Sequence, residues 1–559
     1  MAINKALHNR DSKGRPISTV QARNGQYTLD MMVRGGHAVT QNTANTIGNF
    51  DVQGFRYAAV TWLVSNNHPL HEFETPAFKE MIAYANPEAA AALWVSHRSV
   101  SAYIMRLYRC IEPHVVRLLS KAISKIHISF DGWTTKGGKR GFFGIIAHFA
   151  DAAGIVRDLP LAIPQLTGAH TGVRIAEVVA EILRRFGVSA STVGYFVLDN
   201  AAANNAAVAH LANKYGFDAA HRRLRCAPHT LNLVGQMIMF GVDGDAYNNS
   251  TEEIATEDLY MREWRKDGPL GVLIDIVSYI RTPTQHDRFK DAQRASNSFP
   301  HANTDKYLEP VKPVVTRWNS YFNAFERAVT LKDAIDKFAA DHIDRQYGDD
   351  ARARGRNKQL PDAPAWMRSD GLRAADWAVI TEYIEALRPL KEATDSLQAR
   401  GKTGGFGAIY EVVPQFEAIL KLYETVIEQY EDVDFNHNGA PEDHLAINLR
   451  AAWKKLDCYY GKLDASPVHY AACCLHPYYK NYCSNSWRDK PDWITQNDAA
   501  LQQLWASYKP PSPEKPRPKQ PRMSSSRDTI TALVNVEPAG DDDTTQYDQL
   551  QRWRRFEPA

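Results

Sequence analysis

Two short apolar runs, each ending in an aspartate, constrain the fold of this chain more than any other feature. Residues 126–131 (IHISFD) alternate between apolar and polar side chains, and residues 195–199 (YFVLD) are apolar up to the last position. Alternation is typical of a half-buried strand, and a continuous apolar run is typical of a central one. A carboxylate ending a buried strand is costly unless it binds a cation or accepts hydrogen bonds. The pattern therefore predicts a metal site formed by Asp131 and Asp199 at the rim of a sheet, and points to phosphoryl-transfer chemistry on nucleic acid.

A second interpretation of the two aspartates is structural. Asp199 directly precedes a stretch with helical spacing, so its side chain could cap the first turn of that helix. Asp131 could likewise be a turn residue. The two positions alone leave both interpretations open, because capping aspartates are common where helices begin.

The overall composition excludes several classes of protein. A formal charge of +2 over 559 residues is nearly balanced, so any DNA-binding surface must come from local patches. Six cysteines in a chain of this length do not make a disulfide framework and favour a reducing compartment. No stretch approaches the roughly 18 consecutive apolar residues of a membrane helix, and the N-terminus has no signal-peptide core. We therefore expect a soluble, intracellular protein with no membrane partner.

The period of the apolar residues changes along the chain and predicts one α/β domain followed by a helical one. From residue 55 to about 125 apolar residues recur at three and four positions, as in helices, and from residue 126 they alternate, as in a half-buried strand. Beyond about residue 319 they again recur at three and four positions. The expected strands are 126–131, 141–149, 155–166 and 192–198, with helices at 172–186 and 201–215. The expected later helices are 321–342, 375–398, 407–429 and 444–460.

Two further clusters carry metal-ligating or charged residues. Cys226 and His229 have the spacing of half a zinc site, but no second half follows at zinc-finger spacing. The arginines at 222, 223 and 225 instead favour a segment that faces phosphate, although a buried cysteine beside a hydrogen-bonded histidine remains an alternative. The cysteines at 473, 474 and 483 lie near His469 and His476, in or beside an apolar run, so core packing is expected there rather than zinc binding.

Four motifs in one order give the chain a family resemblance. Together they resemble the hAT transposases, the family named for hobo, Activator and Tam3. The resemblance covers about residues 55–493. A further match is 475–480 (LHPYYK). The four motifs are 131–134 (DGWT), 199–205 (DNAAANN), 226–233 (CAPHTLNL) and 316–320 (TRWNS).

The resemblance implies a fold, a reaction and a set of site residues. The implied fold class is α/β plus all-α, with a ribonuclease-H-like mixed sheet core interrupted by a large helical insertion domain. The implied reaction is DDE-type cleavage and transfer of DNA strands, with transposon ends and target DNA as partners in the nucleus. Asp131 and Asp199 would hold Mg²⁺ or Mn²⁺, and Cys226 and His229 would lie beside the scissile phosphate. Arg317 and Trp318 match the start of the insertion, where the tryptophan stabilises an unstacked base.

The expected domains follow from the motifs and the composition together. We predict a disordered N-terminus (1–50), a helical N-terminal domain (51–120), the first part of the catalytic core (121–316), the helical insertion (317–462), a return to the core (463–505) and a basic, proline-rich linker with a C-terminal tail (506–559).

Two parts of the family pattern have no match in this sequence. Neither a paired Cys/His zinc finger before residue 55 nor a C-terminal dimerisation segment with the third catalytic acid is found. The glutamates at 326, 411, 417 and 557 are present, but no motif nominates any of them. We therefore expect impaired catalysis and a weakened tendency to form a homo-oligomer. The alternatives are a non-catalytic DNA- or protein-binding protein that keeps the fold, and an unrelated ribonuclease-H-like nuclease, which the long helical domain disfavours.

Overall fold

The computed structural model describes residues 50–135, 140–168, 171–240, 268–296, 307–314, 318–398, 409–431, 433, 443–508 and 549–555. The chain divides into two compact units, residues 1–121 and residues 122–559, and each is described by itself. Most of the predicted N-terminal and linker segments lie outside the described residues. Within the described ranges, no helix has the combined length and apolar character that crossing a membrane requires.

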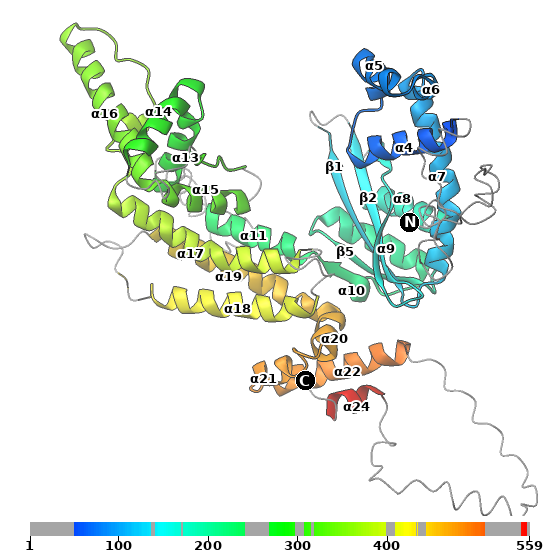
Figure 1. Ribbon diagram of the computed structural model, residues 1–559. Helices are drawn as coiled ribbons and strands as arrows, with labels where there is room; N and C mark the ends of the chain where they lie inside the picture. Colours follow the sequence, from blue (N-terminus) through cyan, green and yellow to red (C-terminus); the bar gives the residue numbers. More distant parts are fainter. Residues whose placement is uncertain are drawn as a thin grey trace, which may run out of the picture. The chain divides into compact units, whose positions relative to one another are not determined.

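The first unit is a small group of helices around buried aromatic rings. Side chains of Asp51, Asn86 and Ser96 each accept an amide hydrogen bond at the start of a helix, which fixes where those helices begin. Phe73 is fully buried and stacks on Trp94, with 5.4 Å between ring centroids. The elements are α4 (Val52–Ser65), η1 (Glu72–Glu74), α5 (Pro76–Ala85), α6 (Pro87–Ala92) and α7 (His97–Ser120) (Figure 1).

The second unit begins with a mixed sheet, as the sequence predicts. Its strand order is β3-β2-β1-β5-β6, with β4 beside β2. β1 pairs antiparallel with β2 and parallel with β5, and β5 pairs parallel with β6. Three parallel strands therefore end at the same edge. The strands are β1 (Ile126–Thr134), β2 (Gly141–Ala150), β3 (Val156–Ala162), β4 (Gln165–Leu166), β5 (Val193–Leu198) and β6 (Arg223–Arg225).

Two details of the sheet differ from the prediction. The expected strand 155–166 is divided into β3 and β4, because the chain breaks at Ile163 and Pro164 and Pro164 has no amide to donate to a ladder. The short strand β6 was not predicted. It has only three residues, two of them arginines, so it gives no apolar signal, and it lies at the sheet edge, where charge is common.

Helices connect the strands that form the site. α8 (Gly172–Arg185) begins at Thr171, whose hydroxyl accepts from the Arg174 amide, and its apolar stripe is buried. α9 ends at Gly216, which adopts φ 71°, a left-handed conformation that favours glycine. Figure 1 shows both helices beside the strands. The remaining helices here are α9 (Ala202–Tyr215), α10 (Ala219–Arg222) and α11 (Ala227–Phe240).

The rest of the unit is helical, as the apolar spacing predicts. The expected helix 321–342 is two helices in the structure, with the break at Leu331. Asn448 is fully buried and donates to the Ile238 carbonyl at 2.9 Å, joining α19 to α11. The helices are α13 (Pro269–Ile280), α14 (Pro283–Ala295), α15 (Trp318–Thr330), α16 (Lys332–Gly355), α17 (Ala374–Leu397), α18 (Ile409–Glu428) and α19 (Asp443–Tyr460), with 3-10 turns η2 (Ala365–Met367) and η3 (Leu463–Ala465).

The last described helices pack on the same helical core. The cysteines at 473, 474 and 483 are buried there, as expected from their apolar surroundings. Trp553 donates to the Cys474 carbonyl at 2.8 Å, and Arg554 pairs with Asp498 at 2.8 Å, so the C-terminal fragment is held by specific contacts. These helices are α20 (Val468–Leu475), α21 (Tyr482–Ser486), α22 (Pro491–Tyr508) and α24 (Gln549–Arg555).

Candidate metal and nucleic-acid site

The two aspartates lie at equivalent positions on neighbouring parallel strands. Ser129 of β1 pairs with Val197 of β5. Asp131 and Asp199 each come two residues later in the same direction. Because side chains alternate with a period of two, both project from the same face of the sheet near the same edge. The structure thus brings together the two residues that the sequence predicts to act together.

Each of the two carboxylates accepts hydrogen bonds through only one of its oxygens in the described part of the chain. Asp131 Oδ1 accepts from the Gly132 amide at 2.8 Å, and the residue is exposed. Asp199 Oδ1 accepts from the Ala201 amide at 2.9 Å and from Asn204 Nδ2 at 2.6 Å, at the start of α9. The structural interpretation of Asp199 therefore accounts for one of its oxygens. Within the described residues, the other oxygen of each aspartate has no protein donor.

Cys226 directly follows the third parallel strand, β6, and lies beside both acids. Its amide donates to the Leu198 carbonyl at 2.8 Å, which continues the β5–β6 ladder. Burial raises the pKa of the Cys226 thiol, and the charges of Asp199 and Asp131 raise it further, while the His229 backbone N–H and the Arg223 charge oppose them. The charges of both carboxylates therefore affect the pKa of the same thiol. The hydrogen bond from the His229 backbone N–H joins Cys226, the residue before α11, to the first turn of that helix. This bond gives a structural reason for the Cys-x-x-His spacing.

Arginines of β6 donate hydrogen bonds to groups at the end of β5, next to Asp199. Arg223 donates to the Leu198 carbonyl at 3.1 Å and to the Asp199 carbonyl. Arg225 donates to Asn200 Oδ1 at 2.9 Å, and Asn200 in turn donates to the Thr230 hydroxyl at 3.2 Å. Burial lowers the pKa of Arg223 to about 10, and the neighbouring Arg225 charge acts in the same direction. Positive charge is thus concentrated beside the acidic pair.

The donor set suits a hard divalent cation. Mg²⁺ and Mn²⁺ prefer carboxylate oxygens, and a pair of aspartates at one strand edge supplies them. Among the described residues, no group of three or more His, Cys, Asp or Glu side chains is arranged to hold a metal ion. Three of the glutamates considered from the sequence have other partners: Glu326 pairs with Arg388, Glu411 accepts from Ser396, and Glu417 accepts from several donors. Glu557 lies outside the described residues.

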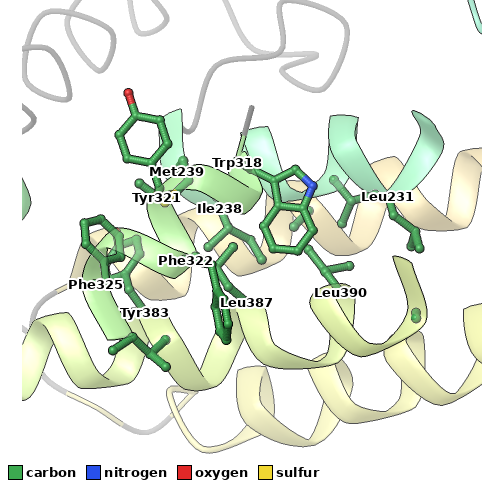
Figure 2. Packing of buried hydrophobic residues seen from close by; sticks show 14 of the residues in the cluster. Leu231, Ile238, Met239, Trp318, Tyr321, Phe322, Phe325, Tyr383, Leu387 and Leu390 are labelled. Atoms are coloured by element: carbon green, nitrogen blue, oxygen red, sulfur yellow. The ribbon is translucent and has the colours of Figure 1, made fainter. Parts of the chain in front are cut away.

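Trp318 occupies a different environment from the one predicted for it. Its side chain is buried, with 1% exposed, and lies against Gly235 of α11, where an added Cβ would be 2.5 Å from the indole. Figure 2 shows the indole among Ile238, Phe322 and Leu390. The base-stacking role therefore requires this packing to open first. Arg317 lies outside the described residues.

A hydrogen-bonded chain on the sheet face was missed from the sequence. Ser129 Oγ lies 2.7 Å from His148 Nε2, and His148 Nδ1 lies 2.7 Å from Asp158 Oδ1. The three residues come from β1, β2 and β3, and Ser129 is two positions before Asp131. The polar positions His127 and Ser129 that alternate in β1 were a signal for a shared face, and β2 has a single polar side chain there, His148, but pairing with Asp158 depends on strand register.

Comparison with known proteins agrees with the resemblance carried by the motifs. Residues 129–221 match the family model of the ZBED1 RNase-like domain. This match supports an hAT-related, transposase-like protein, and it covers the segment that contains Asp131 and Asp199.

A curated relative adds a second observation. The chain is 21% identical over 314 residues to the "Putative transcriptional regulator tpeD" of Talaromyces stipitatus, a match that covers 55% of this chain. The same match spans only about a third (36%) of the length of that relative.

Proposed function

We propose that this chain is a transposase-derived DNA-binding protein whose Asp131–Asp199 pair holds Mg²⁺ or Mn²⁺ against a DNA phosphate. The register of β1 and β5 carries the proposal, because it puts two carboxylates with unused oxygens on one face at one strand edge. The match of residues 129–221 to an hAT-related domain supports DNA as the substrate. The helices α15 to α19, which lie within the predicted insertion 317–462, would then form the insertion of a ribonuclease-H-like core.

The residues of this chain would each have a defined part in holding DNA. Asp131 and Asp199 would bind the cation, which when bound neutralises phosphate charge and activates water or a hydroxyl for attack on a phosphodiester. Asn204 and the Ala201 amide hold Asp199 in place. His229, partly buried in the first turn of α11, would lie beside the bound phosphate. Arg223 keeps the strand ends together.

Metal binding and DNA cleavage test the proposal separately. We expect Mn²⁺ to bind the wild-type chain in calorimetry, and Asp199→Asn to abolish that binding, because it removes one of the two anionic ligands. Asp489→Asn is a matched control, since that aspartate is exposed and far along the chain from the site. Equal Mn²⁺ binding by wild type and Asp199→Asn would refute the assignment of the metal site.

An assay of DNA strand cleavage tests whether the chain is an enzyme or a non-catalytic binding protein. The expectation from the sequence is impaired cleavage, and it stays a prediction. We expect at most slow, Mn²⁺-dependent nicking of supercoiled plasmid. Rapid nicking that disappears in Asp199→Asn would show a complete catalytic site instead. No nicking together with retained DNA binding would favour the alternative, a domesticated binding protein, in line with a relative whose name describes a transcriptional regulator.

Because DNA is the proposed substrate, we also propose that the protein is located in the nucleus. A fluorescent fusion of the whole chain, viewed in cells, tests it. Exclusion of the fusion from the nucleus would contradict a role on chromosomal DNA.

A further inference from the structure

Beside Asp199, at the edge of the sheet, the fold brings together a group of positively charged side chains. These side chains would not take part in the proposed metal site. Three positively charged side chains surround the ring of Tyr459, near the end of α19. Lys462 Nζ lies 4.6 Å from the ring centroid, Lys455 Nζ 5.8 Å and Arg225 Cζ 5.9 Å. We call these four residues the Tyr459 cluster. Arg225 belongs to β6 and the lysines to a distant part of the chain, so only folding brings them together.

A cavity adjoins the cluster. It has a volume of about 220 Å³ and is lined by residues from β6, α9, α10 and the segment after α19. Arg223, Arg225 and Lys462 contribute positive charge to its wall. Arg223 Nε is buried and, within the described residues, has no hydrogen-bond partner. A buried donor without an acceptor is costly, and an anionic oxygen in the cavity would satisfy it. The other lining residues are Asn205, Val208, Ala219, Ala220 and Ala465.

Two of the cations in the cluster, Arg225 and Lys462, have no acidic partner in the described part of the chain. Among the described residues, neither Arg225 nor Lys462 forms an ion pair with a carboxylate, and Arg225 donates instead to the neutral amide of Asn200. Many other basic side chains of this chain do have acidic partners, such as Arg388 with Glu326. Because the whole chain carries a formal charge of only +2, this concentration of positive charge is a local property of the sheet edge.

We propose that the Tyr459 cluster binds phosphate groups of the DNA backbone beside the phosphate held at Asp131 and Asp199. This inference rests on the proposed function and adds the place where the flanking backbone is held. The two aspartates by themselves repel a phosphate, so a strand reaching them needs positive charge nearby. Arg225 connects the two sites directly, since it bonds to Asn200, the residue after Asp199. Lysine and arginine heads that contact phosphates position a strand without reading its sequence.

The salt dependence of DNA binding tests the cluster. Duplex DNA of arbitrary sequence is titrated with the full chain by fluorescence anisotropy, over a series from about 50 to 200 mM salt. We expect Lys455→Gln with Lys462→Gln to reduce the slope of log K against log salt by about 2, close to one unit for each phosphate that the lysines no longer neutralise. The loss of affinity should be the same for unrelated DNA sequences. Lys462→Arg keeps the charge and should keep the slope.

Controls separate this inference from the proposed function. Lys358→Gln removes a charge of the same kind from an exposed residue outside the cluster, and it should leave the slope unchanged. Circular dichroism and thermal unfolding confirm that each variant is folded. If wild type binds DNA but the double variant has the wild-type slope, the cluster is not a phosphate site and the proposed function stands. A loss confined to one DNA sequence would also overturn the inference. If wild type binds no DNA, both proposals fail.

Discussion

The contact between Gly235 and Trp318 gives a stability experiment that also probes the predicted role of the tryptophan. A Cβ added at Gly235 would lie 2.5 Å from Trp318 Cγ and 2.6 Å from Cδ2, far inside normal carbon contact. Alanine in a helix interior ordinarily stabilises a protein by about 1 kcal/mol relative to glycine. Overpacking of a filled core costs about 1–3 kcal/mol. Gly235→Ala should therefore destabilise the helical core by up to about 2 kcal/mol.

The same substitution should change sign when the indole is removed. Trp318→Ala alone should cost about 3–5 kcal/mol, because it empties a buried aromatic site. In that background the new methyl group at position 235 meets no ring, and Gly235→Ala should stabilise by about 1 kcal/mol. The two residues are thus expected to show a coupling of about 1–3 kcal/mol in a double-mutant cycle.

Thermal unfolding of the full chain, followed by circular dichroism, measures the effect. A change of 1 kcal/mol corresponds to a shift in Tm of about 2–4 °C for a domain of roughly 150–250 residues, and to a smaller shift for a larger unit such as residues 122–559. Gly348→Ala is the matched control: the glycine lies inside α16, where an added Cβ would be in ordinary contact with Arg352, at 3.7 Å, and with no other side chain in the described part of the chain. If Gly235→Ala stabilised wild type as much as Gly348→Ala does, the indole would not be packed here in solution. The tryptophan would then be available to stack on a base.

Two further predictions concern half-buried polar side chains, His127 and Glu417. Burial lowers the pKa of His127 from 6.5 to about 4, so its contribution to stability is complete above pH about 6.5 and is lost as pH falls to about 4. His127→Gln should remove about 3 kcal/mol of this pH dependence in urea unfolding at pH 4 against pH 7, and an unchanged difference would contradict it. Glu417 accepts from the hydroxyls of Tyr460, Tyr482 and Ser486 and from the Trp487 indole, so Glu417→Ala should lower stability by about 3 kcal/mol. A loss below about 1 kcal/mol would mean that water replaces the carboxylate.

Much of the fold was predictable because local patterns and tertiary packing agree. The alternation of residues 126–131 and the apolar run before Asp199 predicted β1 and β5, and helical spacing predicted α17, α18 and α19 with small errors at their ends. The helices α11, α13 and α14 were not predicted, and two smaller features had weak signals. β6 has three residues and two charges, and the break at Leu331 lies inside a continuous apolar pattern.

The sequence predicted that Asp131 and Asp199 lie together, but it did not predict the residues around them. The sequence nominated Asp131, Asp199 and Cys226, and the three parallel strands bring all three to one edge. The motif that contains Trp318 did not predict that this side chain is buried, because its burial depends on Gly235, a residue of another helix. The Tyr459 cluster was not predictable, since no short segment contains both its arginine and its lysines.

The sequence by itself determined which residues end the strands and which faces of the helices are apolar, because these depend on spacing along the chain. It also determined that positive charge is concentrated in and just before β6, through the arginines at 222, 223 and 225. Only the tertiary structure decided that Ser129 pairs with Val197, which aligns the two aspartates. It also decided that Lys462 approaches Arg225 across Tyr459. Both depend on strand register and helix packing between distant segments, and no local pattern encodes these distances.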